Sequence, residues 1–202
     1  MWFYQQTPEL QEKVRGLVKN GQLELINAGW SMHDEACPIF DDMINNMKIG
    51  HDFILKEFDF KPTIGWQIDP FGHSNANVRI SAEMGFDAWF YARLDNSDKG
   101  KRTDERTLEF VHIPNKESLG SETRIFEHVL WNHYEAPNGF NFDMIDGDVG
   151  FIIDPANEDY NAPTRAVELM KELDDRIQHY VTDDILVLFG TDFKYENAYW
   201  NY

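Results

Sequence analysis

The stretch IGWQIDPFGHSNANVRISAEMGFDAWFYA, residues 64–92, shows the alternation of strand and helix that runs through this chain. Residues 64–68 are apolar enough for a buried strand. Asp69 and Pro70 end that strand, because proline fixes its own φ and restricts the residue before it. Residues 75–84 predict a helix ended by a glycine, and residues 88–92 predict the next strand. This order is typical of a βαβ unit.

The same alternation continues on both sides of this unit. Further helices are predicted over residues 7–21 and 39–58 and from Pro163 onward, and further strands over residues 23–27, 125–130 and 185–189. Residues 99–124 form the most polar stretch, which we interpret as a long excursion inside one domain. We therefore expect an α/β fold with about five parallel strands, forming a single domain over residues 1–202.

Charge and composition limit the classes of partner. The 202 residues contain 18 Lys and Arg against 36 Asp and Glu, so the net charge of −18 argues against nucleic acid or an anionic membrane surface. The one cysteine, Cys37, excludes an internal disulfide framework and a thiolate zinc cluster. No apolar run reaches the roughly 18 residues that span a bilayer, and the first residues show no signal-peptide pattern. We expect neither a nucleic-acid nor a membrane partner.

The candidates for function are the residues that follow the predicted strands, because side chains with chemistry collect at the carboxyl ends of parallel strands. They are Asp69, Phe71, Arg93, Tyr134 and Asp192. Flat aromatic rings can pack on sugar faces, and carboxylates can serve as acid, base or nucleophile. This combination indicates a carbohydrate site.

Each candidate also has an ordinary structural alternative. Asp69 and Asp192 could cap a helix or close a turn. Arg93 could form a structural ion pair, and Phe71 and Tyr134 could pack within loops. Two carboxylates expected at one edge favour glycoside hydrolysis, which uses one as nucleophile or base and the other as acid; their separation would decide between retention and inversion.

The histidines do not form a metal site on spacing alone. Four histidines are candidate metal ligands: His33, His73, His112 and His133. The sequence contains neither an HExxH motif nor a His-x-His pair, the spacings typical of a metal site. A lone histidine after a strand is more often a loop residue with a hydrogen-bond partner than a metal ligand.

Several motifs in order resemble the α-mannosidases of glycoside hydrolase family 38, of the lysosomal type. The longest is GWQIDPFGHS at residues 65–74, which resembles the nucleophile segment of that family. AGWSMHDEA at 28–36 and MGFDAWFYARLD at 84–95 resemble the strand ends on either side. GTDFKYENA at 190–198 resembles the acid/base region, so the likeness covers essentially the whole chain.

The resemblance implies a seven-stranded β/α barrel, of which this chain would supply a middle section. It assigns the nucleophile to Asp69, which would also ligate a catalytic zinc, and the general acid/base to Asp192. Sugar contacts fall on Phe71, Arg93 and Tyr134. The implied reaction is the retaining hydrolysis of terminal α-D-mannose from oligosaccharides or glycoproteins, with zinc holding sugar hydroxyls.

The same resemblance implies that the zinc site is incomplete in these 202 residues. The family's other ligands, a His-x-Asp pair and a distant histidine, fall before and after the stretch that matches, which leaves Asp69 alone. We expect a truncated segment that is inactive by itself, with the rest of the barrel as its partner and a lysosome or vacuole as its compartment. The alternatives are a mannose-binding remnant without turnover, a truncated gene product without independent function and, more distantly, a polysaccharide deacetylase-like hydrolase.

Overall fold

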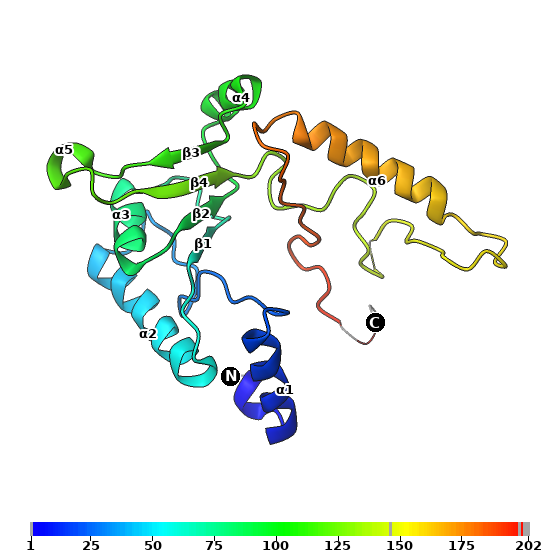
Figure 1. Ribbon diagram of the computed structural model, residues 1–202, viewed down its shortest axis with the longest axis horizontal. Coiled ribbons are helices and arrows are strands. Elements are labelled where there is room, and N and C mark those ends of the chain that lie inside the picture. The colour runs from blue at the N-terminus through cyan, green and yellow to red at the C-terminus, as the bar shows by residue number, and fades with distance from the viewer. Residues whose placement is uncertain (1, 146, 198, 200–202) are drawn as a thin grey trace. The chain divides into compact units, whose positions relative to one another are not determined.

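The structure, a computed structural model, describes residues 2–145, 147–197 and 199. Its helices are η1 (Trp2–Gln5), α1 (Pro8–Lys19), α2 (Phe40–Phe58), α3 (Asn75–Met84), α4 (Asn96–Glu105), α5 (Lys116–Leu119) and α6 (Ala162–Ile177). Its strands are β1 (Ile64–Gln67), β2 (Ala88–Tyr91), β3 (Glu109–His112) and β4 (Ile125–Val129), as Figure 1 shows. None of the helices in this described part of the chain is long and apolar enough to cross a membrane.

The chain divides into two compact units. The first contains Met1–Leu94 and Phe110–His128, and the second contains Asp95–Glu109 and Val129–Tyr202. This division follows packing alone, so the expectation of one domain over residues 1–202 stays a prediction. Ala198, the last residue of the motif at 190–198, lies outside the described residues.

The strands form one mixed sheet in the order β1-β2-β4-β3. β1 and β2 pair in parallel, with Gln67 opposite Tyr91. β3 leads to α5 and β4 returns from it, so these two neighbours run in opposite directions (Figure 1). The α/β class is confirmed, whereas the expectation of about five strands, all parallel, is corrected to four strands with an antiparallel edge in the residues that the structure describes.

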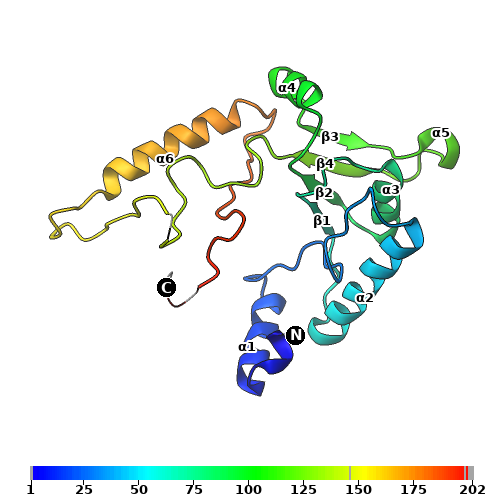
Figure 2. The ribbon, with the colours of Figure 1, turned by 180° about the vertical axis from the view of Figure 1, so that it is seen from behind.

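Helices α1, α2 and α3 pack in sequence in the first unit, α1 against α2 and α2 against α3, as Figures 1 and 2 show. Local chemistry sets their ends. Thr7 caps α1 by accepting a hydrogen bond from the backbone N–H of Leu10. Gly85 ends α3 in the left-handed conformation that the sequence predicted for it.

Two predicted strands are wrong. Residues 23–27 form no strand because Asn27 and Ala28 adopt positive φ angles of 56° and 57°, which break an extended ladder. The Asn27 N–H donates to the carbonyl of Ile64 at 2.7 Å, so the segment meets β1 at one point. Residues 185–189 also form no strand; the carbonyl of Leu186 accepts a hydrogen bond from the side chain of Arg176 at 3.4 Å.

Residues 99–124 contain regular structure that the sequence analysis did not predict, because α4 ends and β3 and α5 form within them. α4 is a polar helix that depends on local pairs rather than on an apolar stripe. Asp95 caps it by accepting from the N–H groups of Ser97 and Asp98, and Arg102 donates to Asp98 at 2.9 Å one turn away. A polar stretch of sequence can therefore form a helix when local pairs support it.

Gly50 allows α2 to approach the motif at residues 28–36. A Cβ at this position would collide with the carbonyl oxygen of Ala28. We expect Gly50→Ala to lower the free energy of unfolding by about 1–3 kcal/mol, because backbone on both sides must move. Urea unfolding will measure it. The control is Gly16→Ala on α1, where nothing lies within 4 Å and the change should stabilise by up to about 1 kcal/mol; equal effects of the two substitutions would contradict the close approach.

Candidate active site

The parallel pairing of β1 and β2 brings Asp69 and Arg93 together. Gln67 lies opposite Tyr91 in the register, and Asp69 and Arg93 are each the second residue after that pair. The guanidinium Nη2 of Arg93 donates to Oδ1 of Asp69 at 3.1 Å. The side chains are 61% exposed for Asp69 and 37% for Arg93, so the ion pair faces solvent at the end of the strands.

The turn that follows Asp69 presents an aromatic ring. Pro70 is buried and anchors the turn, whereas Phe71 is 76% exposed. A phenyl ring exposed next to a carboxylate offers an apolar face to a ligand. The structure therefore places three of the sequence-predicted residues, Asp69, Phe71 and Arg93, at one end of β1 and β2.

The second unit brings the other two predicted residues together. Tyr134 is 9% exposed, and its hydroxyl donates to Oδ2 of Asp192 at 3.4 Å. Both lie beside backbone in the left-handed region: His133 has φ 53° and Phe193 has φ 58°. Each predicted carboxylate is thus held by a side chain that was also predicted to belong to the site.

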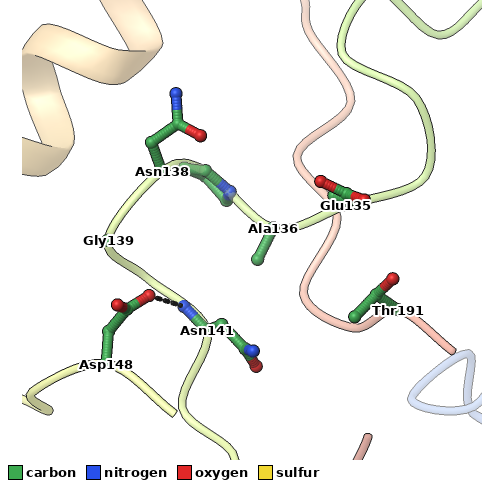
Figure 3. Close-up of a pocket in the computed structure, with 8 residues that line it drawn as sticks. Glu135, Ala136, Asn138, Gly139, Asn141, Asp148 and Thr191 are labelled. Carbon is green, nitrogen blue, oxygen red and sulfur yellow. Dashed lines mark hydrogen bonds between the residues drawn. The ribbon is translucent and has the colours of Figure 1, made fainter. Parts of the chain in front are cut away.

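A pocket in the second unit, shown in Figure 3, is lined in part by Thr191, the residue before Asp192. Its lining residues are Glu135, Ala136, Pro137, Asn138, Gly139, Asn141, Asp148 and Thr191. Asp148 accepts a hydrogen bond from the backbone N–H of Asn141 at 2.9 Å, which Figure 3 marks. Thr191 directly precedes Asp192 in the chain. The carboxylate, amide and hydroxyl groups of this lining can recognise sugar hydroxyls.

Glu35 and His73 form a buried pair behind the turn at Asp69. The Glu35 side chain is 1% exposed and that of His73 is 16% exposed. His73 Nδ1 lies 3.2 Å from Oε1 of Glu35, and its Nε2 lies 2.8 Å from the carbonyl oxygen of Arg93. Both partners are acceptors, so both ring nitrogens of His73 donate, as they do only in the imidazolium form.

Opposing effects set the pKa of His73. Burial lowers it, but hydrogen bonds to Glu35 and to the Arg93 carbonyl raise it, as do the negative charges of Glu35 and Glu127. The net pKa of His73 is raised above its ordinary value. The structure therefore favours the charged imidazolium that the two hydrogen bonds require.

Glu127 is a buried carboxylate that the sequence analysis missed. It is 4% exposed on β4, where its Oε2 accepts from the Tyr91 hydroxyl at 2.9 Å and its Oε1 lies 2.5 Å from His112 Nδ1. It thus joins side chains from three neighbouring strands. The only signal in the sequence was a glutamate inside the short strand predicted over residues 125–130, whose other residues include Ile125 and Val129; a carboxylate buried in such a strand needs a partner.

The residues present do not fit a zinc ion by themselves. In the described part of the chain, no three His, Cys, Asp or Glu side chains come together as a metal site. Asp69, the one ligand that the resemblance implies, already accepts from Arg93. His33 lies between Asn46 and Asn77, with its Nδ1 3.1 Å from an Asn46 amide nitrogen and its Nε2 3.0 Å from an Asn77 oxygen.

Asp69 is a carboxylate held by an arginine beside an exposed aromatic ring, and Asp192 is a second carboxylate, held by a tyrosine hydroxyl. Two carboxylates are the groups with which most enzymes cleave glycosidic bonds. Comparison with known families makes this specific. Residues 1–202 match the N-terminal domain of the glycosyl hydrolases family 38, and the chain belongs to that family.

The curated relatives carry α-mannosidase names. An α-mannosidase of Arabidopsis thaliana is 44% identical over 199 residues, which are 98% of this chain and 19% of the relative. The lysosomal α-mannosidase of Dictyostelium discoideum is 40% identical over 98% of this chain and 19% of its own length. The human lysosomal α-mannosidase is 35% identical over 98% of this chain and 20% of its own length. The chain thus spans about a fifth of the length of these relatives.

Proposed function

We propose that the complete protein hydrolyses terminal α-D-mannose residues of oligosaccharides and glycoproteins, with retention of anomeric configuration. The observation that carries this proposal is the match to one glycosidase domain along the whole chain. The relatives' α-mannosidase names support the choice of mannose-containing glycans as substrates. Asp69 and Asp192 supply the two carboxylates that such a reaction needs.

In the first step of the proposed reaction, Asp69 acts as the nucleophile. One of its carboxylate oxygens bonds to C1 of the mannose while the bond from C1 to the glycosidic oxygen breaks. Asp192 gives its proton to that departing oxygen, so the rest of the glycan leaves as an alcohol. The hydrogen bond from Arg93 to Oδ1 of Asp69 fixes the carboxylate and leaves Oδ2 for the attack.

In the second step, water releases the sugar. Asp192, now a carboxylate, takes a proton from a water molecule whose oxygen bonds to C1, and the bond between C1 and Asp69 breaks. Both aspartates return to their starting states, and one water is consumed. Two displacements at C1 retain the configuration. The hydrogen bond from the Tyr134 hydroxyl to Oδ2 of Asp192 orients this group for both proton transfers.

The surroundings of the two carboxylates suit a sugar substrate. The exposed ring of Phe71 can pack against one face of the mannose. Asp192 protonates the leaving oxygen in this proposal, so the departing sugar must lie beside it. We assign that sugar to the polar pocket lined by Asn138, Asn141 and Thr191.

Compartment and metal are further parts of the proposal. The lysosomal names of two relatives support a lysosome or vacuole as the site of action. Zinc is the metal that the resemblance implies, and Asp69 would be one of its ligands. We propose that the remaining ligands come from outside these 202 residues, and no step above depends on the ion.

A comparison of two proteins tests this function. We expect the protein expressed from its complete reading frame to release mannose from an aryl α-mannoside and to hold about one zinc per chain. We expect the 202 residues alone to hold less than about a tenth of that and to show no turnover, because a single carboxylate cannot retain the ion. Zinc is measured by mass spectrometry after dialysis, and the release of mannose from the aryl α-mannoside is measured for both proteins. Zinc-dependent turnover by the 202 residues would contradict the missing ligand set, and a complete protein that cleaves no mannoside would contradict the function.

A further inference from the structure

Glu35 and His73 tie together three segments of the first unit. Glu35 belongs to the loop after residue 30, His73 to the turn that follows Asp69, and Arg93 to the end of β2. One oxygen of Glu35 contacts His73 at 3.2 Å, and the other accepts from the backbone N–H of Ser74 at 2.5 Å. Both oxygens of this buried carboxylate thus accept hydrogen bonds from the turn that follows Asp69.

Arg93 links this arrangement to Asp69. Its backbone carbonyl accepts from His73 at 2.8 Å, while its guanidinium donates to Asp69 at 3.1 Å. Asp69 is therefore held from two sides. The chain connects it to His73, and the guanidinium of Arg93, whose backbone is held by His73, donates to it. Pro70, which is buried and has a fixed φ, removes freedom from the chain between Asp69 and His73.

The geometry points to the Glu35–His73 pair as a charged positioning device for Asp69, in which the imidazolium of His73 fixes the nucleophile's turn and the backbone of Arg93 at the same time. This role rests on the proposed function of Asp69. Neither Glu35 nor His73 touches the sugar in it. Loss of either charge frees Arg93 and the turn, and a displacement of about 1 Å at a reacting group can cost about 10²-fold in rate.

The groups facing His73 determine how the device responds to pH. Glu35 and the Arg93 carbonyl accept hydrogen bonds from its two ring N–H groups, and the ring of Tyr91 packs against it at 4.4 Å between centroids. Tyr91 in turn donates to Glu127, whose charge acts on His73. The pKa of His73 is raised in the folded protein. The charged His73 therefore contributes its full stabilisation below pH about 6.5, the ordinary pKa of histidine. That contribution is lost as pH rises through the raised pKa. The device is thus fully formed in an acidic lumen.

Glu35→Gln in the protein from its complete reading frame tests this role by two readouts. We expect the alkaline limb of kcat to move down by about one pH unit or more, because His73 loses its neighbouring negative charge. Hydrogen–deuterium exchange at C2 of the His73 imidazole, followed by mass spectrometry of its peptide, should show the same fall in midpoint without any need for turnover. Glu35→Asp keeps the charge and should restore much of the limb; it also serves if Glu35→Gln does not fold.

The matched control is Glu57→Gln at the end of α2. Glu57 is also largely buried, at 9% side-chain exposure, and is bonded to Arg15 and Tyr4. Its replacement should leave both the alkaline limb and the His73 midpoint unchanged. Suppose that the protein is active. If Glu35→Gln then changes neither the alkaline limb of kcat nor the His73 midpoint, or if Glu57→Gln changes them as much as Glu35→Gln does, the positioning role is overturned and the proposed function stands. A complete protein without mannoside hydrolysis overturns the proposed function together with this role, and the His73 midpoint then still shows whether the pair is charged.

Discussion

Asp69→Asn will lower kcat/KM for an aryl α-mannoside by about 10⁴-fold or more, which is the scale of loss when a nucleophile is removed. The asparagine amide is nearly the same size and keeps an oxygen for Arg93, but it carries no negative charge with which to attack C1. The Asp69 side chain is 61% exposed, so the thermal unfolding midpoint should stay close to that of the wild type. Steady-state kinetics beside a thermal melt will separate lost chemistry from lost folding.

A covalent trap makes the assignment of Asp69 direct. A fluorinated mannosyl fluoride, whose glycosyl–enzyme ester hydrolyses slowly, loses fluoride as its C1 bonds to the nucleophile. We expect the added sugar mass on the peptide that contains Asp69, and no label in Asp69→Asn. Asp52→Asn is the matched control, because Asp52 is 63% exposed and also pairs with a cation, Lys48. A label on another residue would show that Asp69 is not the nucleophile.

The contact between Asp69 and Arg93 was predictable from the sequence. Two strands in a βαβ unit lie side by side in parallel, so residues just beyond them meet at one edge of the sheet. The observed register does this. The limits of α3 were predictable for a local reason, because Gly85 can adopt the left-handed conformation that ends a helix.

The parts that sequence reasoning missed depend on contacts between distant residues. The apolar alternation over residues 23–27 is that of a strand, yet Asn27 and Ala28 turn the backbone into the left-handed region. The sequence does not name the partners of Glu35 and Glu127, and only the fold shows that each is buried against a histidine. Their partners lie on other segments, so periodicity along one segment carries no information about them.

Asp192→Asn will produce a different kinetic pattern from Asp69→Asn. The acid/base group matters only where the leaving oxygen must gain a proton or the attacking water must lose one. For a poor leaving group the loss should be about 10²- to 10⁴-fold in kcat/KM, the usual contribution of general acid catalysis. For a dinitrophenyl mannoside, whose oxygen leaves without a proton, the first step should be nearly normal and release of the glycosyl–enzyme should limit turnover.

Azide supplies the decisive measurement for Asp192. It is a nucleophile that needs no general base, so it should restore turnover of the dinitrophenyl substrate by Asp192→Asn and yield the α-mannosyl azide with retained configuration. Asp183→Asn, at an exposed carboxylate in the same unit, should behave as the wild type with and without azide. A loss that is equal for good and poor leaving groups, with no response to azide, would assign Asp192 a role in binding or folding. A β-mannosyl azide would contradict the retaining mechanism, because an inverted product requires a single displacement at C1 in place of two.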